Sequence, residues 1–147
     1  MVVALYMVQR PRIGSLGLAG SVLYAYAYVF FTFTVIFALS RGIPTYDSLS
    51  DELGLWMLAH GAFMVVAGLC FGYATFRAGV LPKWTGLALM AGVVAVSATQ
   101  SAPEAIQVAA AAVRDLAFAG MGTAVLLKGR ERFPSGKALP TRPQVIR

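Results

Sequence analysis

The sequence predicts an all-α integral membrane protein, a four-transmembrane-helix bundle with both termini in the cytoplasm. Of its 147 residues, 59% are hydrophobic and 12% are charged, which is about half the charged share of a soluble domain. Charged residues and prolines divide the chain into four apolar stretches. Each is close to or above the ~20 residues that a helix needs to cross the bilayer core. No stretch has the alternating pattern of a transmembrane β-strand.

The predicted spans cover residues 13–40, 53–76, 84–100 and 104–127, within one transmembrane domain of residues 1–128. Ser101-Ala-Pro-Glu104 has the pattern of a capping box, which predicts that the fourth helix follows the third as a tight hairpin. Residues 1–8 are apolar but too short to span, so we expect an interfacial segment or the end of a helix that starts upstream. Residues 129–147 hold three prolines and mostly basic charge, and they are predicted to form a cytoplasmic tail.

The basic residues lie almost entirely on one side of the predicted spans. Ten of the twelve flank one set of helix ends: Arg10, Arg12, Arg77, Lys83, Lys128, Arg130, Arg132, Lys137, Arg142 and Arg147. The opposite side has one basic residue, Arg41, together with Asp47, Asp51, Glu52 and Glu104. By the positive-inside rule, both termini are therefore predicted to be cytoplasmic.

Small residues predict where the helices pack, because association in lipid relies on close approach of backbones. Gly61, Gly68 and Gly72 fall on one side of the second predicted span. Ala91 and Gly92 lie in the third. We expect the third and fourth spans to pack tightly through such positions.

Arg114 and Asp115 interrupt the fourth predicted span near the bilayer midplane. Each such charge costs roughly 2.5 to 3.5 kcal/mol before it is paired. Neighbouring residues point about 100° apart on a helix, so at least one of the two is expected to have a partner on another helix or subunit. Tyr24 or Tyr28, near midplane depth on the first span, is expected among the hydrogen-bond partners. The pair is interpreted as a structural clamp or, alternatively, as part of a transport path.

Four further polar residues lie in the outer half of the predicted bundle: His60, Gln100, Glu104 and Gln107. Together with Arg114 they are candidates to line a shallow, outward-facing polar pocket. A lone histidine is more often a hydrogen-bonded packing residue than a ligand, so His60 has both interpretations.

Other kinds of site have no pattern in the sequence. The single histidine excludes bis-histidine haem ligation within one chain, and no cysteine or histidine cluster has zinc spacing. Cys70, the only cysteine, is expected to be a small buried apolar residue. The sequence shows no pattern of a catalytic triad, a phosphate-binding glycine loop or an aromatic platform for nucleic acid. We therefore assign no catalytic or metal-binding residue, leave any cofactor open and expect no nucleic-acid partner.

The segment Arg77-Ala-Gly-Val-Leu-Pro-Lys-Trp-Thr-Gly86 resembles a helix–loop–helix segment common in uncharacterised multi-pass bacterial membrane proteins. The resemblance implies a cytoplasmic turn between two spans in a bacterial inner membrane and brings no assigned activity. Those proteins often have more than four spans.

Three functions remain open. The favoured one is a non-catalytic accessory or scaffold subunit of a larger membrane complex, because the chain is small, its loops are short and no catalytic constellation is present. The second is a small oligomeric transporter or channel with Arg114 and Asp115 on its path. The third is a haem-binding or enzymatic membrane subunit that uses His60 across a dimer. The expected partners are the lipid bilayer and other membrane subunits or further copies of the chain.

Overall fold

The computed structural model describes residues 1–132, except for the side chains of Glu104 and of residues 130–132. Within this part the chain forms six α-helices and no strand. Three regions are long and apolar enough to cross a membrane, namely Gly14–Arg41, Leu55–Ala78 and Ala105–Gly129. The prediction of an all-helical chain is thus confirmed for the described residues, and three of its helices could span a membrane by length and composition. The predicted tail lies outside the described residues from residue 133 onward.

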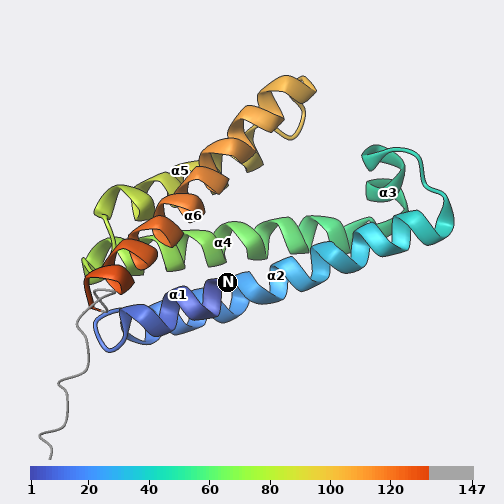
Figure 1. Cartoon of the computed structure of the whole chain (residues 1–147). Helices are drawn as coiled ribbons and strands as arrows, with labels where there is room; N and C mark the ends of the chain where they lie inside the picture. Colours follow the sequence, from blue (N-terminus) through green and yellow to red (C-terminus); the bar gives the residue numbers. More distant parts are fainter. Residues whose placement is uncertain (133–147) are drawn as a thin grey trace, which may run out of the picture.

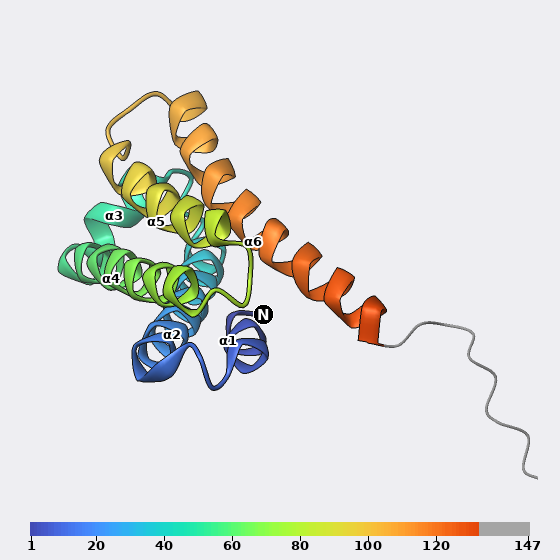
Figure 2. The same ribbon diagram turned by 90° about the vertical axis from the view of Figure 1, so that its left-hand side faces the viewer.

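The long antiparallel pair of the fold consists of α2 (Gly14–Arg41) and α4 (Leu55–Ala78), as Figure 1 shows. A hairpin of α5 (Lys83–Ala98) and α6 (Glu104–Arg132) packs on α4, which lies between this hairpin and α2 (Figure 2). Glycine brings the backbones close together, because a Cβ at Gly20 would lie 2.6 Å from the backbone nitrogen of Phe71. The bundle is therefore assembled partly through direct backbone contact.

The third predicted span corresponds to a helix that is shorter than the other three. The segment expected over residues 84–100 is the 16-residue helix α5, about 24 Å long, whereas a ~30 Å hydrocarbon core needs about 20 residues. The helix ends before Thr99, whose hydroxyl donates to the carbonyl oxygen of Ala95 at 2.8 Å. A short turn then leads into α6. Consequently α5 is apolar but does not reach the length that the other three apolar helices have.

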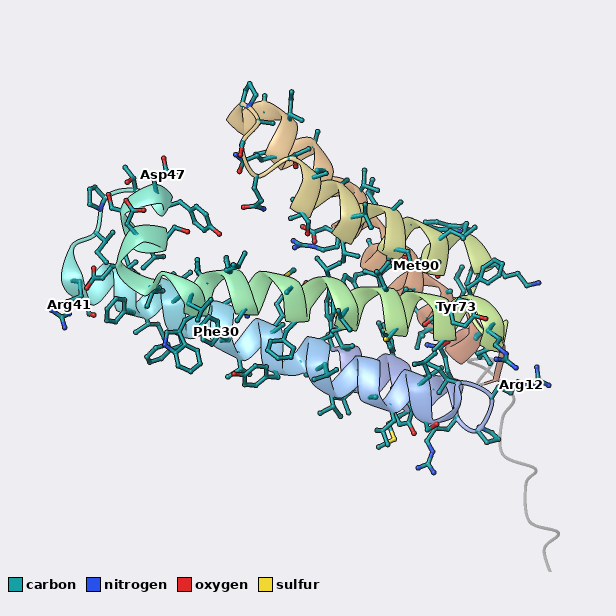
Figure 3. All side chains as sticks on the ribbon, turned by 180° about the vertical axis from the view of Figure 1, so that it is seen from behind. Arg12, Phe30, Arg41, Asp47, Tyr73 and Met90 are labelled. Atoms are coloured by element: carbon teal, nitrogen blue, oxygen red, sulfur yellow. The ribbon has the colours of Figure 1, made fainter. Side chains whose placement is uncertain are left out.

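The hydrophobic core lies at the level where the four longer helices meet. Each of them contributes one large side chain with no exposed surface: Tyr24, Phe71, Leu89 and Met121. Towards the α5–α6 turn, the hairpin diverges from α4, as Figures 1 and 3 show from opposite sides. The α5–α6 hairpin therefore packs on α4 over only part of its length.

The apolar segment at the beginning of the chain forms α1 (Val2–Gln9), which lies alongside α2. It buries one face, at the spacing of an amphipathic helix: Val2, Leu5, Tyr6 and Gln9. Nε2 of Gln9 donates to Oγ1 of Thr75 in α4 at 3.4 Å. The segment is therefore an integral part of the bundle's packing.

An eight-residue helix, α3 (Tyr46–Leu53), covers the start of α4 and was not expected. Thr45 caps it, since its Oγ1 accepts a hydrogen bond from the backbone nitrogen of Ser48. Gly54 joins α3 to α4 with a φ of +50°, which glycine adopts readily because it has no Cβ.

Apart from Arg114 and Asp115 in the middle of α6, the charged residues of the described part lie towards the two ends of the helices. Arg12 lies at the end where α2 starts and α4 finishes, while Arg41 and Asp47 lie at the opposite end (Figure 3). Near Arg12's end, the Lys128 side chain donates to the carbonyl oxygen of Val80 in the α4–α5 connection. The helix arrangement thus keeps the basic and acidic loops apart.

Candidate functional site

Arg114 and Asp115 form a salt bridge in the middle of α6. Nε of Arg114 donates to Oδ1 of Asp115 at 3.0 Å, about 15 Å along the helix from its first residue. The Arg114 side chain is 16% exposed, whereas that of Asp115 is 61% exposed. The pair therefore consists of a largely covered cation and an open carboxylate.

This geometry differs from the expectation that one of the two charges has its partner on another helix. The arginine side chain is long and flexible enough to bend across the angle between adjacent helical positions. Among the described residues, neither Tyr24 nor Tyr28 is hydrogen-bonded to Arg114, and Oδ2 of Asp115 has no hydrogen-bond partner. The pair is thus a contact within α6, and one carboxylate oxygen remains open.

Gly92 brings the backbone of α5 onto that of α6 at the level of the charged pair. A Cβ at Gly92 would lie 2.6 Å from both the backbone nitrogen and the Cα of Arg114. On α4, a Cβ at Gly68 would lie 2.6 Å from Cγ1 of Val93, and one at Gly72 would lie 2.9 Å from the carbonyl oxygen of Gly86. These three glycines lie where neighbouring helices approach each other closely.

Gly61 was expected in the same packing face and instead faces open space. Nothing lies within 4 Å of a Cβ built at this position. Gly61 precedes Gly68 by seven residues and so lies on the same side of α4. Gly61 lies near the beginning of α4, however, and the α5–α6 hairpin diverges from that end of α4 (Figure 3). The packing role expected for Gly61 is therefore wrong, because no neighbouring residue covers the side of α4 on which Gly61 lies.

Tyr24 packs against two other aromatic rings, one of them on α6. The centroid of its ring lies 5.4 Å from that of Tyr28 and 5.6 Å from that of Phe118, which is one turn from Arg114 on α6. The hydroxyl of Tyr24 is buried and has no hydrogen-bond partner among the described residues. Within this part of the chain, the two tyrosines thus contribute ring contacts.

Gln100 and Gln107 hold the α5–α6 turn together. Nε2 of Gln107 donates to the carbonyl oxygens of Gln100 at 3.1 Å and Ala102 at 2.9 Å, and Nε2 of Gln100 donates to that of Val96 at 2.9 Å. These bonds satisfy carbonyl groups that a helix end leaves unpaired. The side chain of Glu104, which was expected in the same polar pocket, lies outside the described part of the chain.

His60 lies apart from these glutamines and from the charged pair. It lines a cavity of about 40 Å³ with residues of α2 and α4 only: Tyr26, Phe30, Trp56, Ala59 and Phe63. The structure therefore does not bring His60 together with Gln100, Gln107 and Arg114 in one polar pocket.

The aromatic surroundings of His60 are the feature that the sequence interpretation missed. A signal for them exists, because Trp56, His60 and Phe63 are spaced by four and three residues. Tyr26 and Phe30 are spaced by four. Residues at these separations share one face of a helix. The spacing therefore indicates an aromatic face on each helix, but it does not indicate that the two faces are in contact.

Metal ligands do not gather anywhere among the described side chains. No group of three or more His, Cys, Asp or Glu residues in this part could hold a metal ion. Cys70 is half-buried and not in a disulfide.

Comparison with known protein families, with curated proteins and with solved structures finds no match to this chain. The contacts described above are therefore the basis on which a function is proposed.

Proposed function

We propose that this chain is a non-catalytic accessory or scaffold subunit of a larger complex in the bacterial inner membrane. The observation that carries the proposal is the open carboxylate of Asp115, 61% exposed in the middle of an apolar helix. A charge in contact with lipid at that depth costs roughly 2.5 to 3.5 kcal/mol. Coverage by a helix of another subunit would remove this contact with lipid.

The surface of α6 around Asp115 has the form of a helix-packing seam. Exposed residues, with one half-buried glycine at position 122, recur there at spacings of four and three: Val108, Ala112, Asp115, Ala119, Gly122 and Leu126. A Cβ at Gly122 would meet nothing within 4 Å, so the backbone is open to a neighbour. Such heptad spacing favours a partner helix, and small residues permit close approach in lipid.

The partner that fits this seam is a transmembrane helix with a hydrogen-bond donor at the depth of Asp115. A neutral amide or hydroxyl would pair with the open Oδ2 without adding a further charge. A second copy of this chain also fits. Across a two-fold axis normal to the membrane, Arg114 and Asp115 of one copy would face Arg114 and Asp115 of the other. We favour a different subunit and make the second copy an outcome of the experiment.

A photo-crosslinker on α6 tests the assembly in the native membrane. In a Cys70→Ala chain, benzophenone maleimide at Ala119→Cys should give one defined protein adduct. The same probe at Leu116→Cys, which is also exposed but off the seam, should give mainly lipid adducts. Mass spectrometry of the Ala119 adduct then distinguishes a different subunit from a second copy. Indistinguishable adducts from the two positions would contradict the proposed seam.

We also propose four crossings with both termini cytoplasmic. The separation of basic and acidic loops to opposite ends supports this orientation. For α5, support comes from its antiparallel packing between α4 and α6, and the turn at residues 99–102 adds to its 16 residues. Together these residues come close to the length that a crossing needs.

Cysteine accessibility tests this topology. In intact cells with Cys70 replaced, a membrane-impermeant maleimide should label Ser48→Cys and Ser101→Cys but not Pro82→Cys. All three positions are exposed in the structure, so folding alone does not hide them. Pro82→Cys should become reactive once the membrane is permeabilised. Labelling of Pro82→Cys from outside would overturn the orientation, and protection of Ser101→Cys would remove α5 as a crossing.

A further inference from the structure

His60 has an imidazole with both nitrogens buried and unpaired. The residue is 8% exposed, and neither Nδ1 nor Nε2 has a hydrogen-bond partner among the described residues. A neutral imidazole offers one N–H donor and one acceptor nitrogen. Burying such groups without a partner is unfavourable, and most buried polar groups in proteins are satisfied. The position therefore has hydrogen-bonding capacity that the described part of the chain does not use.

Aromatic rings surround the same imidazole. Phe30 stacks on it with ring centroids 4.4 Å apart and planes at 25°. Tyr26, Trp56 and Phe63 line the cavity beside it, and all three are exposed on the outer surface of the helix pair. Because the N–H and the lone pair of an imidazole lie in the ring plane, a hydrogen-bonded group would approach a ring nitrogen at the edge and not on the face that Phe30 covers. The rings offer flat surfaces for a flat ligand.

The cavity opens towards the surface that the bilayer would cover. Its volume is about 40 Å³, more than one water molecule requires but less than a whole six-membered ring. It would admit the carbonyl edge of such a ring, while the rest lay between the exposed side chains of Trp56 and Phe63. His60 is the sixth residue of α4, about 8 Å from the helix start, so a ligand held there would keep its tail in the hydrocarbon.

We propose that His60 and the four rings around it bind the head of a lipid-soluble quinone. The N–H of the imidazole would donate to a quinone carbonyl, and in the reduced form a quinol hydroxyl would donate to the other nitrogen. An acyl chain would leave both nitrogens unpaired, whereas a planar ring with carbonyl groups uses the imidazole and the aromatic walls together. This site does not depend on the proposed assembly through α6.

A single-residue NMR signal provides the direct test. His60 is the only histidine, so the full chain labelled with ¹⁵N-histidine in detergent reports this imidazole alone. Titration with decylubiquinone should shift the two ring nitrogen resonances along a saturating curve. An equal concentration of n-decane, which has the tail but no ring, should leave them unchanged. Unchanged resonances with decylubiquinone, or identical shifts with n-decane, would overturn the proposal.

Fluorescence of Trp56 provides the matched variant test. In a Trp84→Phe chain, decylubiquinone should quench Trp56 saturably, and His60→Leu should raise the apparent Kd at least tenfold. Met57→Leu is the control, because Met57 is buried on the same helix but does not line the cavity. Equal Kd values for His60→Leu and Met57→Leu would contradict the site. If His60→Leu fails to fold, the NMR titration of the unaltered chain decides the question.

Discussion

Replacing Gly92 with leucine is expected to lower the free energy of unfolding by about 3 kcal/mol. Already the first added atom, Cβ, would lie 2.6 Å from the backbone nitrogen and Cα of Arg114. A backbone cannot turn aside as a flexible side chain can, so α5 and α6 would have to separate. In a thermal melt in detergent, we expect the midpoint to fall by roughly 6 to 12 °C.

Ala91→Leu is the matched control for this experiment. Ala91 is exposed, whereas the adjacent Gly92 is buried, so the same side chain would extend away from α6. We expect a change within about 0.5 kcal/mol of the unaltered chain. The sequence treated the two positions alike, and the structure separates them. Equal destabilisation by Ala91→Leu and Gly92→Leu would contradict the described packing of α5 on α6.

Asp115→Asn is expected to reduce folded yield or assembly by an amount that corresponds to about 1 to 3 kcal/mol. The substitution removes the anion that Arg114 contacts at 3.0 Å and leaves a largely covered guanidinium without an opposite charge. Replacing both residues, as Arg114→Leu with Asp115→Ala, should recover much of the loss, because no uncompensated charge remains. Monodisperse yield after detergent extraction measures the effect.

The same double variant separates the structural interpretation from a transport path. If the pair stabilises folding and assembly, the single replacement is harmful and the double replacement is close to normal. If the pair lies on a transport path, the double replacement folds and assembles normally but abolishes flux. Wild-type yield, assembly and flux in both variants would contradict both interpretations, and α6 would then be better placed at the membrane interface.

Much of the fold follows from local composition. The first predicted span, residues 13–40, differs by one residue at each end from α2, Gly14–Arg41. The second predicted span, residues 53–76, begins two residues before α4. The reason is that the additional helix α3, which Thr45 caps, extends to Leu53, and Gly54 then turns the chain. The sequence contains that cap, but a short polar helix between two long apolar ones leaves a weaker pattern than a span does.

The candidate site was less accessible to sequence reasoning. Depth along a helix indicated that Arg114 and Asp115 lie near the midplane, but it did not show that they pair with each other. Likewise, the seven-residue spacing of Gly61 and Gly68 placed them on one side of α4 without showing where the hairpin diverges. The contact of Phe30 with His60 joins two helices whose relative rotation no spacing within either helix specifies.

The sequence by itself determined which long segments are helical and apolar and on which side of them the basic residues fall. These properties depend on neighbours along the chain, since length and hydropathy govern whether a helix partitions into lipid. Only the tertiary structure decided that Gly92 is covered while Gly61 is open, and that His60 meets aromatic rings rather than the glutamines. Those outcomes depend on how helices rotate, slide and diverge against each other. Such freedoms are fixed by the packing of whole helix surfaces and not by the spacing of residues within one helix.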